Sequence, residues 1–312
     1  MVVDQALLDE LGRCCRGELL RNEPLSRYTT WRVGGPAAAL FRPANHVDLV
    51  RGLRLLRSAG LPWLVLGGGS NLLVRDGGYA GMVIDLRHFN AVRIGAEGLV
   101  EAEAGVRLNA LIKQLVTAGL AGLEELAGIP GTVGGAVVMN AGAGRQEFGS
   151  VVEEVEVLSG DTFAWRQAGA FGFAYRQSGL EPGEIVTAVR LRLAGGDPEL
   201  LGAIYAERLD HRRQAHAVGG PSAGSVFKNP PGMRAWELVQ RSGWRGRGIG
   251  GAAVAERHAN FIINRGTATA ADIEALIAAI RRDVQRDAGV TLEAEVKIVG
   301  VPAAAGPAGE DA

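Results

Sequence analysis

The sequence has very little cysteine and no long apolar run. Only two cysteines occur among its 312 residues, and these, Cys14 and Cys15, are adjacent. Neighbouring cysteines rarely form a disulfide, and neither belongs to a set with metal-ligand spacing. We therefore expect two thiols on the apolar side of a first helix, in a reducing compartment. No apolar stretch approaches the roughly 18 residues that a membrane helix needs, so no membrane contact is predicted.

Signals for export, nucleic acid and metal are also missing. The first ten residues carry acids and no basic segment ahead of an apolar one, which is unlike a signal peptide and favours a cytoplasmic protein. The net charge of −1 provides no basic field of the kind that binds nucleic acid. The five histidines show no ligand spacing such as His-Glu-x-x-His. We therefore predict neither a nucleic-acid partner nor a metal.

Glycine, in contrast, is abundant, with 46 residues or about twice the usual share. One cluster, Gly67-Gly68-Gly69-Ser70-Asn71, follows a predicted strand, and a second spans 127–144 with six glycines in eighteen residues. Bare backbone lets N–H groups converge on a phosphate. Two such clusters about 60 residues apart suit an extended ligand with a diphosphate. Neither matches the dinucleotide fingerprint or a P-loop, and plain turns are the alternative.

Periodicity predicts a mixed α and β chain. Helices are expected at 4–20, 46–59, 107–118, 198–214, 234–242 and 270–288. Strands are expected at 29–33, 61–66, 82–86, 99–102, 153–158, 185–193, 224–228, 259–263 and 292–299. The glycine density of 127–144 predicts no regular element there. A composition shift at 194–198 predicts a domain boundary, Asp4 is an available helix cap, and Thr269 with Asp272 resembles a capping box.

Three polar groups stand out beside these loops. In 222-SAGSVFKNPPG-232, Ser225 follows a glycine and precedes a short apolar pair, so it is either a hairpin end or a ligand contact. Arg176, after an aromatic run, is either a surface charge or a group that holds a carboxylate or oxyanion. Glu293 and Glu295 are two apart on a predicted strand and face the same side, where a solvated strand face is the alternative.

Taken together, these segments resemble the UDP-N-acetylenolpyruvoylglucosamine reductases, flavoenzymes of bacterial peptidoglycan synthesis. The resemblance covers about residues 20–300 and is specific because seven motifs follow in order. They are Tyr28-Thr29-Thr30 with Gly34-Gly35, 66-LGGGSNLL-73, 128-GIPGTVGGA-136, 174-AYRQS-178, 223-AGSVFKNP-230, 258-HANFIIN-264 and 292-LEAEVKIVG-300. Arg176 and Ser225 are only 49 residues apart, which resembles the shorter type that lacks a tyrosine-bearing loop.

The resemblance implies an α+β fold. A two-lobed FAD-binding unit of the vanillyl-alcohol-oxidase (PCMH) kind is expected at 25–195, after an N-terminal helix in 1–24. A smaller α/β substrate-binding domain is expected at 198–300, and a disordered tail at 301–312. Cofactor contacts are expected from both glycine clusters, at Gly67, Gly68, Gly69, Ser70, Asn71, Gly128, Ile129, Pro130, Gly131, Thr132, Gly134, Gly135, Asn140 and Gly142.

The resemblance also implies the reaction. NADPH reduces FAD, and hydride then passes from the flavin to the enolpyruvyl CH2 carbon of UDP-N-acetylglucosamine enolpyruvate, giving UDP-N-acetylmuramate. Arg176 matches the residue that steadies the enolate, Glu295 the assisting glutamate and Ser225 the proton donor. A neutral Glu295 can donate to the enolate oxygen, whereas an ionised one repels it, so Glu295 is expected to be protonated or closely paired.

Substrate contacts are expected at Tyr175, Asn229 and a basic residue that is either Arg213, the preferred assignment, or Arg212. Two positions depart from the family pattern. Lys297 stands where the family usually has Arg, which replaces a bidentate contact by a point charge, and His216-Ala217 replaces a Gln-Pro pair.

Two other functions are open on the sequence alone. One is an oxidase or dehydrogenase with covalently bound FAD, although neither glycine cluster contains the His or Cys that such a bond needs. The other is a nucleotide-sugar-binding regulator without activity, against which the retention of Arg176, Ser225 and Glu295 argues.

Overall fold

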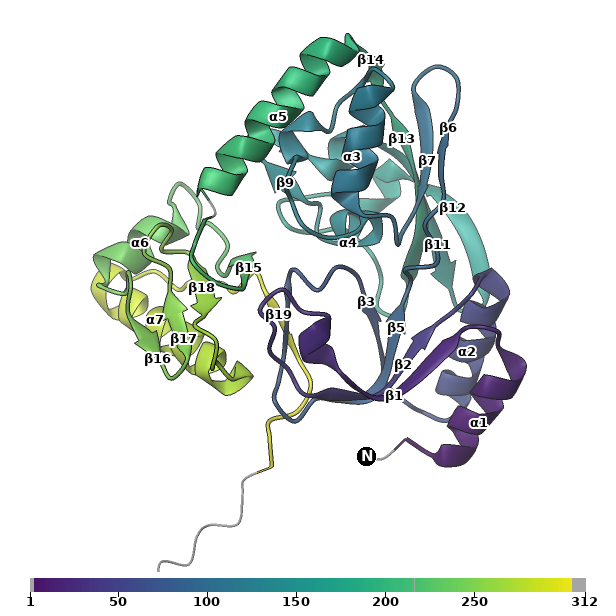
Figure 1. Ribbon diagram of the computed structural model, residues 1–312, viewed down its shortest axis with the longest axis horizontal. Helices are drawn as coiled ribbons and strands as arrows, with labels where there is room; N and C mark the ends of the chain where they lie inside the picture. Colours follow the sequence, from purple (N-terminus) through teal and green to yellow (C-terminus); the bar gives the residue numbers. More distant parts are fainter. Residues whose placement is uncertain (1–2, 216, 305–312) are drawn as a thin grey trace, which may run out of the picture.

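The computed structural model describes residues 3–215 and 217–304, which form two lobes and a C-terminal domain (Figure 1). The lower lobe contains a four-stranded sheet in the order β1 (Glu18–Pro24), β2 (Pro36–Arg42), β5 (Tyr79–Asp85) and β3 (Trp63–Leu66). The pairs β2–β5 and β3–β5 are parallel, and β1–β2 is antiparallel. Helices α1 (Gln5–Cys14) and α2 (His46–Ser58) cover one face, where Phe41, Met82 and Ile84 share a core with helix leucines.

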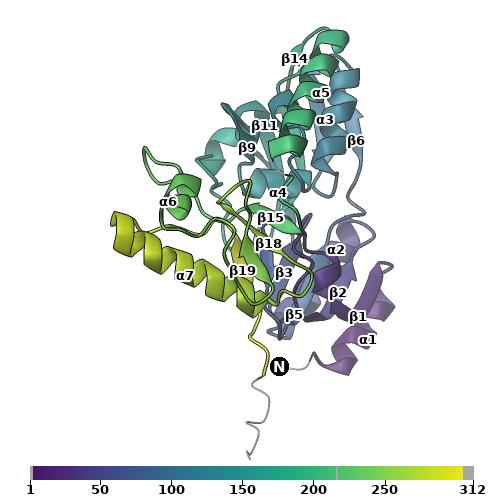
Figure 2. The ribbon, with the colours of Figure 1, turned by 60° about the vertical axis from the view of Figure 1, so that its left-hand side comes forward.

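The upper lobe is built on a five-stranded antiparallel sheet. Its strands, in order, are β12 (Thr162–Gln167), β11 (Val152–Ser159), β13 (Ile185–Arg192), β7 (Leu99–Glu103) and β6 (Val92–Ile94). Helices α3 (Leu108–Thr117) and α4 (Val133–Val138) pack beside it, and α5 (Pro198–Ala215) packs on α3 (Figure 2). Leu201 of α5 is buried in the core of this lobe. Helix α5 therefore packs as part of the upper lobe.

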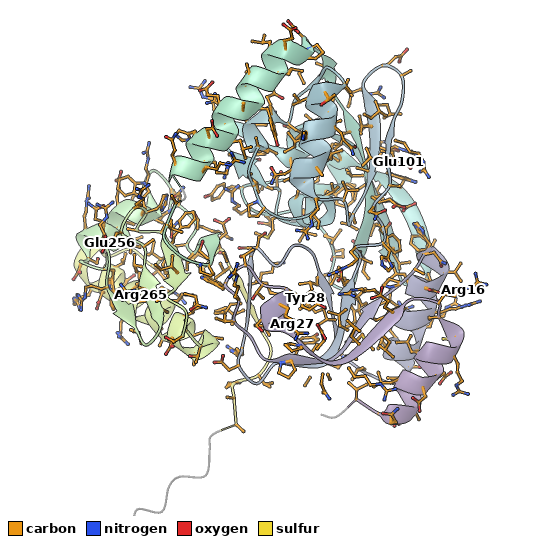
Figure 3. The ribbon with its side chains drawn as sticks, viewed as in Figure 1. Arg16, Arg27, Tyr28, Glu101, Glu256 and Arg265 are labelled. Carbon is orange, nitrogen blue, oxygen red and sulfur yellow. The ribbon has the colours of Figure 1, made fainter. Side chains whose placement is uncertain are left out.

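Short segments complete the upper lobe. They are the pairs β8 (Leu120–Ala121) with β14 (Ala194–Gly195) and β9 (Gly142–Ala143) with β10 (Gln146–Glu147), and single-turn 3-10 helices at Glu124–Leu126, Phe148–Val151 and Ala168–Phe171. A further such turn, Leu25–Arg27, lies in the lower lobe. Figure 3 shows Arg27 and Tyr28 in the lower lobe, near the middle of the view.

The C-terminal domain has an antiparallel sheet in the order β15 (Ser222–Ser225), β18 (Phe261–Asn264), β17 (Ala252–Val254) and β16 (Gly248–Ile249). Helices α6 (Ala235–Arg241) and α7 (Ala270–Ala288) pack together on this domain. The apolar stripe of α7, which includes Ile273, Leu276 and Ile280, is buried in its core. The charged residues Glu256 and Arg265 lie on the part of this domain shown at the left of Figure 3.

Segments of the lower lobe are built into the C-terminal domain. Trp31 is fully buried in that domain's core, and its Nε1 donates to the Ile262 carbonyl at 2.7 Å. Asp76 accepts from the Ala270 and Ala271 N–H groups at 2.8 and 2.9 Å, which caps the start of α7. The chain then returns to the lobe, because β19 (Lys297–Val299) pairs in parallel with β4 (Leu72–Val74). The domain is thus anchored to the lower lobe.

Most predicted elements are confirmed. Helices at 46–59, 107–118, 198–214, 234–242 and 270–288 are present with ends shifted by at most two residues, as are the strands at 61–66, 99–102, 153–158, 185–193 and 259–263. The strand predicted at 82–86 is β5, which begins three residues earlier. Asp4 caps α1 through the Ala6 N–H, and the capping box of Thr269 and Asp272 is present. Of the tail predicted to be disordered, 301–312, residues 305–312 lie outside the described residues, whereas Val301 makes backbone hydrogen bonds with Gly77 and Gly78 at 3.0 and 2.9 Å.

Three local predictions are wrong. The helix predicted at 4–20 ends at Cys14, because residues from Glu18 pair with β2 instead. The strand predicted at 29–33 is a turn, in which Thr29 Oγ1 donates to the Val33 carbonyl at 2.8 Å. The glycine-rich stretch 127–144 does contain a helix, α4, whose N-cap is Thr132.

Two predicted strands are much shorter than expected. Strand β15 stops at Ser225, and residues 226–228 pair instead with 293–295 through the single bridge of Phe227 and Ala294. Consequently only Lys297–Val299 of the predicted 292–299 strand forms a ladder with β4. Among the described residues, no helix is both long and apolar enough to cross a bilayer.

Candidate active site

The two glycine-rich loops meet between the lobes. Ser70 Oγ donates to the Pro130 carbonyl at 3.0 Å. A Cβ on Gly68 would lie 2.6 Å from the Gly131 Cα, so the two backbones touch where neither residue has a side chain. Clusters about 60 residues apart in the sequence therefore form one surface of bare backbone.

The first loop is open to an anionic ligand. Within the described residues, the N–H groups of Gly68, Gly69 and Ser70 make no hydrogen bond. Gly69 has φ +62°, and a Cβ there would lie 1.8 Å from the Tyr28 carbonyl oxygen. Beside it, the Thr30 hydroxyl is buried without a partner in the part of the chain that is described. Unpaired backbone N–H groups without nearby side chains can donate hydrogen bonds to a diphosphate. These residues therefore fit a dinucleotide cofactor.

The second loop has more varied roles. Thr132 Oγ1 accepts from Gly135 N–H at 3.4 Å, and Gly134 is required for packing because a Cβ there would lie 2.9 Å from that of Ala104. Asn140 is fully buried at φ +41°, donates to Glu147 at 2.7 Å and accepts from the Gly149 N–H at 2.9 Å. The side chain of Asn140 thus fastens the loop internally.

An ion pair of Arg176 and Glu295 lies beside these loops. Arg176 Nε donates to Glu295 Oε1 at 2.8 Å, and its NH2 group donates to the Gly142 carbonyl at 3.1 Å. Arg176 has φ +56°, a backbone conformation that is costly for a side chain of its size and is found at functional sites. The two side chains are only 21% and 14% exposed. The pair joins the upper lobe to the C-terminal domain.

The carboxyl group of Glu295 is electrostatically strained. Burial raises the pKa of Glu295 above its usual value, and the charges of Arg176 and Lys228 only partly oppose this. Its backbone carbonyl accepts from Asn71 Nδ2 at 3.1 Å, so the first glycine loop touches the same residue. A buried carboxyl group with a raised pKa beside a cation is typical of an active site.

Ser225 lies at a break in the C-terminal sheet. The register of β15 against β18 shifts between Ser222 and Ser225, where Gly224 adopts φ +75°. Such bulges re-aim a side chain and are frequent beside active sites. Within the described residues the Ser225 hydroxyl makes no hydrogen bond. One residue on, the Val226 carbonyl accepts from Glu295 N–H at 2.8 Å, so Ser225 and Glu295 lie on neighbouring backbones.

The two glutamates of the 291–300 segment have separate partners. Glu293 is 71% exposed and accepts from Lys228 Nζ at 2.5 Å, whereas Glu295 pairs with Arg176. Leu292 and Val296, which lie on the opposite face of the predicted strand, are buried.

Tyr175 and Asn229 meet at the edge of the site. The Tyr175 hydroxyl accepts from the Asn229 N–H at 3.4 Å, and the Arg176 guanidinium lies 5.0 Å from the centre of the Tyr175 ring. The Asn229 Oδ1 accepts from the Ala235 N–H at 3.0 Å at the start of α6. Tyr175 is 45% exposed, and so it is accessible to a ligand.

Of the two candidate arginines at the end of α5, only Arg212 lies against the site. Arg212 Nε donates to the Ala127 carbonyl at 2.9 Å, and its Cδ occupies the space beside Gly128. Burial and the positive charge of Arg176 lower the pKa of Arg212, which has no carboxylate partner in the described chain. The side chain of Arg213 is 71% exposed and pairs with Asp210 at 3.5 Å.

Lys297, one of the two departures from the family pattern, lies on the surface. Lys297 begins β19, where its N–H donates to the Asn71 carbonyl at 3.0 Å, and the side chain is exposed. His216 lies outside the described residues. Within them, no three His, Cys, Asp or Glu side chains gather as metal ligands would.

Comparisons with known proteins give the family. Residues 214–299 match the model of the UDP-N-acetylenolpyruvoylglucosamine reductase C-terminal domain, and residues 37–162 match an FAD binding domain. The reductase of Syntrophotalea carbinolica is 46% identical over 294 residues, 94% of this chain and 98% of the relative. That of Geobacter metallireducens is 48% identical over 289 residues, 91% of this chain and 95% of the relative. The chain belongs to the UDP-N-acetylenolpyruvoylglucosamine reductase family.

A solved structure supports the same relationship. The crystal structure of UDP-N-acetylenolpyruvylglucosamine reductase (MurB) from Thermus caldophilus matches with a TM-score of 0.77 at 39% identity, covering 91% of this chain and 98% of that one. Membership in this reductase family confirms the predicted fold class and makes the chain an FAD-dependent oxidoreductase. The C-terminal family domain begins within the last turn of α5, at residue 214.

Proposed function

We propose that this protein reduces the enolpyruvyl group of UDP-N-acetylglucosamine enolpyruvate at the expense of NADPH. The observation that supports this most is the largely buried ion pair of Arg176 and Glu295, which are 2.8 Å apart. The backbone of Glu295 is hydrogen-bonded to Val226, the residue that follows Ser225. The site combines the cation of Arg176, the free hydroxyl of Ser225 and the carboxyl group of Glu295, whose neutral form burial favours. These groups suit a reaction that forms an enolate and then protonates it.

FAD would be held by both glycine loops, with its diphosphate on the free N–H groups of Gly68, Gly69 and Ser70. When bound, FAD would accept hydride from NADPH and supply it to the CH2 carbon of the substrate. The bare backbone of Gly131 and the capped start of α4 at Thr132 complete the surface that faces this loop. The protein's own residues would bind and orient the cofactor and the substrate and would stabilise the charge that develops during the reaction.

Arg176 would stabilise the negative charge that develops on the enolpyruvyl carboxylate. Its guanidinium is oriented by the Gly142 carbonyl, which leaves further donors for the substrate. The substrate carboxylate would replace Glu295 as its ionic partner. Because Glu295 would then lose its nearest cation in a buried place, it would take up a proton and donate a hydrogen bond to the enolate oxygen.

Ser225 would donate the proton that completes the reaction. Once hydride has reached the CH2 carbon, the double-bond electrons lie on the neighbouring carbon and its carboxylate. Ser225 Oγ would give that carbon its proton and recover one from solvent. Gly224 leaves room for the substrate, since a Cβ at this position would meet nothing within 4 Å.

Three further residues would bind the substrate. Tyr175 and Asn229 lie at the rim, and Arg212 provides a positive charge without a carboxylate partner, which favours it over Arg213 as the residue that grips an anionic group. The substrate-binding domain of this proposal follows α5, which packs on the upper lobe. The free thiols Cys14 and Cys15 agree with a reducing, cytoplasmic location.

The purified protein provides the test. We expect a yellow protein whose flavin is released by acid precipitation, is bleached by NADPH without oxygen and regains its colour on addition of UDP-N-acetylglucosamine enolpyruvate. Flavin that remains in the acid pellet would indicate covalent attachment and a different enzyme. Flavin that NADPH bleaches but the enolpyruvyl compound cannot reoxidise would contradict the proposed substrate.

A further inference from the structure

Asn260 makes an unusual set of contacts beside Ser225. Its side chain is buried, with the residue only 4% exposed. Oδ1 accepts from the Phe227 N–H at 3.0 Å, and Nδ2 donates to the Phe227 carbonyl at 2.8 Å. The Asn260 backbone carbonyl accepts from the Val226 N–H at 2.8 Å. One asparagine therefore satisfies three backbone groups of the two residues that follow Ser225.

These contacts replace a missing piece of sheet. Strand β15 leaves β18 at Ser225, after the bulge at Gly224, and so Val226 and Phe227 have no strand partner on that side. Both residues are fully buried, where unpaired backbone groups are costly. The carboxamide of Asn260 presents a donor and an acceptor to Phe227 just as a neighbouring strand would.

The same short segment also carries Glu295. The Val226 carbonyl accepts from the Glu295 N–H at 2.8 Å, and the Lys228 N–H donates to the Glu293 carbonyl at 2.9 Å. Asn260 thus holds Val226 and Phe227 in place. Ser225 directly precedes these two residues, and the backbone of Glu295 is hydrogen-bonded to Val226. A shift of this segment would move the hydroxyl and the carboxyl group together.

We propose that Asn260 is a positioning residue that holds the Ser225 hydroxyl and the Glu295 carboxyl group in their working arrangement. This inference rests on the proposed function, because it assigns Asn260 to the step in which those two groups act. The electron transfer from NADPH to the flavin does not need that step, and so it should be insensitive to Asn260.

Asn264 provides a matched control. It is the last residue of β18, the strand that begins directly after Asn260, is 7% exposed, and donates from Nδ2 to the Trp31 carbonyl at 3.0 Å. Its Oδ1 accepts from Gly266 and Ala268. Asn264→Ala therefore removes a buried amide with a comparable number of hydrogen bonds, but touches nothing between Ser225 and Lys228.

The experiment compares wild type, Ser225→Ala, Asn260→Ala, Asn264→Ala and the double variant Ser225→Ala with Asn260→Ala. Stopped-flow absorbance measures flavin reduction by NADPH and flavin reoxidation by UDP-N-acetylglucosamine enolpyruvate as separate rates. Thermal unfolding of each variant measures the structural cost. Asn260→Asp, which keeps the volume and the acceptor but loses the donor to Phe227, is measured in place of Asn260→Ala should the alanine variant not fold.

We expect both asparagine variants to unfold at lower temperature and to keep their rate of flavin reduction. Only the change at Asn260 should slow reoxidation, by about 10- to 100-fold, because misplacing a reacting group by an ångström costs that much. In the double variant the further loss caused by Asn260→Ala should be smaller than the loss it causes in wild type, since the part of its effect that acts through Ser225 is already gone and only the part that acts through Glu295 remains.

Two results would overturn the inference. If Asn260→Ala slows reoxidation no more than Asn264→Ala while Ser225→Ala slows it strongly, Asn260 is merely structural and the role of Ser225 stands. If Ser225→Ala itself reoxidises at the wild-type rate, the proposed proton donor is wrong and the positioning role falls with it.

Discussion

At the scale of single residues, the protonation of Glu295 is the property on which the proposed chemistry depends. Its pKa is raised because burial disfavours the carboxylate more than Arg176 and Lys228 stabilise it. The folded state therefore holds this proton to a higher pH than the unfolded chain, whose carboxyl groups titrate near about 4.3. Stability should fall as the pH rises from that value through the raised pKa of Glu295.

Glu295→Gln is the variant that isolates this effect. Glutamine keeps the size and a hydrogen-bond acceptor for Arg176 but does not titrate. We expect the melting temperature of the variant, minus that of wild type, to increase as the pH is raised from 4 to 8. Differential scanning calorimetry at several pH values measures it. A difference that stays constant or decreases over this range would show that the ion pair with Arg176 outweighs burial.

The residues of the site differ in how far the sequence could predict them. The spacing of Glu293 and Glu295 placed both on one side of a strand, but only the structure shows that one meets Lys228 and the other Arg176. Arg212 and Arg213 are neighbours on a helix, about 100° apart, and nothing local decides which one faces the loops. Asn260 was missed, since its partners are backbone groups that carry no pattern in the sequence.

At the scale of elements, the contact between the two glycine loops should determine cofactor binding. Gly68→Ala places a Cβ 2.6 Å from the Gly131 Cα, closer than van der Waals contact allows, and so the loops must separate. We expect the variant to fold but to retain less than about half of the flavin of wild type, because a separated surface loses its N–H contacts with the diphosphate. The absorbance ratio of flavin to protein after gel filtration measures this.

Gly202→Ala is the control for that change. Gly202 lies within α5, and a Cβ there would meet nothing within 4 Å. Alanine favours a helix over glycine by about 1 kcal/mol, so this variant should bind flavin fully and be no less stable than wild type. Equal flavin content in the two variants would refute a role of loop contact in binding.

The elements that the sequence predicted well are those with local causes. Helices α2, α3 and α7 have apolar stripes of period 3.6, and α7 also has the capping box of Thr269. The failures have distant causes. Helix α4 lies in a glycine-rich stretch where Gly134 packs against Ala104, in the turn after β7, and residues 226–228 leave β18 to pair with 293–295. Single-sequence periodicity contains no information about such partners.

At the scale of the whole molecule, the C-terminal domain depends on the lower lobe. Its core includes Trp31, Val33 and Leu73, all of which come from the lower lobe. Removing a buried tryptophan typically costs about 3–5 kcal/mol, a large share of a domain's stability. We expect a fragment of residues 214–304 to lack fixed tertiary structure, and near-UV circular dichroism of the fragment is the measurement. A cooperative thermal transition in the fragment would contradict this dependence.

The arrangement of the whole molecule was only partly predictable. The resemblance implied an FAD-binding unit followed by a substrate-binding domain, and the family models match an FAD binding domain followed by a reductase C-terminal domain. It did not predict that α5 packs on the upper lobe while the chain that follows is held by Trp31 and Asp76 of the lower lobe. The C-terminal domain is consequently tied to both lobes, and Arg176–Glu295 lies where it meets the upper one.

The most direct test of the account measures the two half-reactions in Arg176→Ala. In the proposed mechanism Arg176 acts on the enolate and not on the cofactor, so NADPH should reduce the flavin of the variant within about threefold of the wild-type rate. Reoxidation by UDP-N-acetylglucosamine enolpyruvate should be slower by about 100-fold or more, as expected for the loss of a group that stabilises transition-state charge. Anaerobic stopped-flow absorbance separates the two rates. Equal losses in both half-reactions, or an unchanged reoxidation rate, would contradict the central claim.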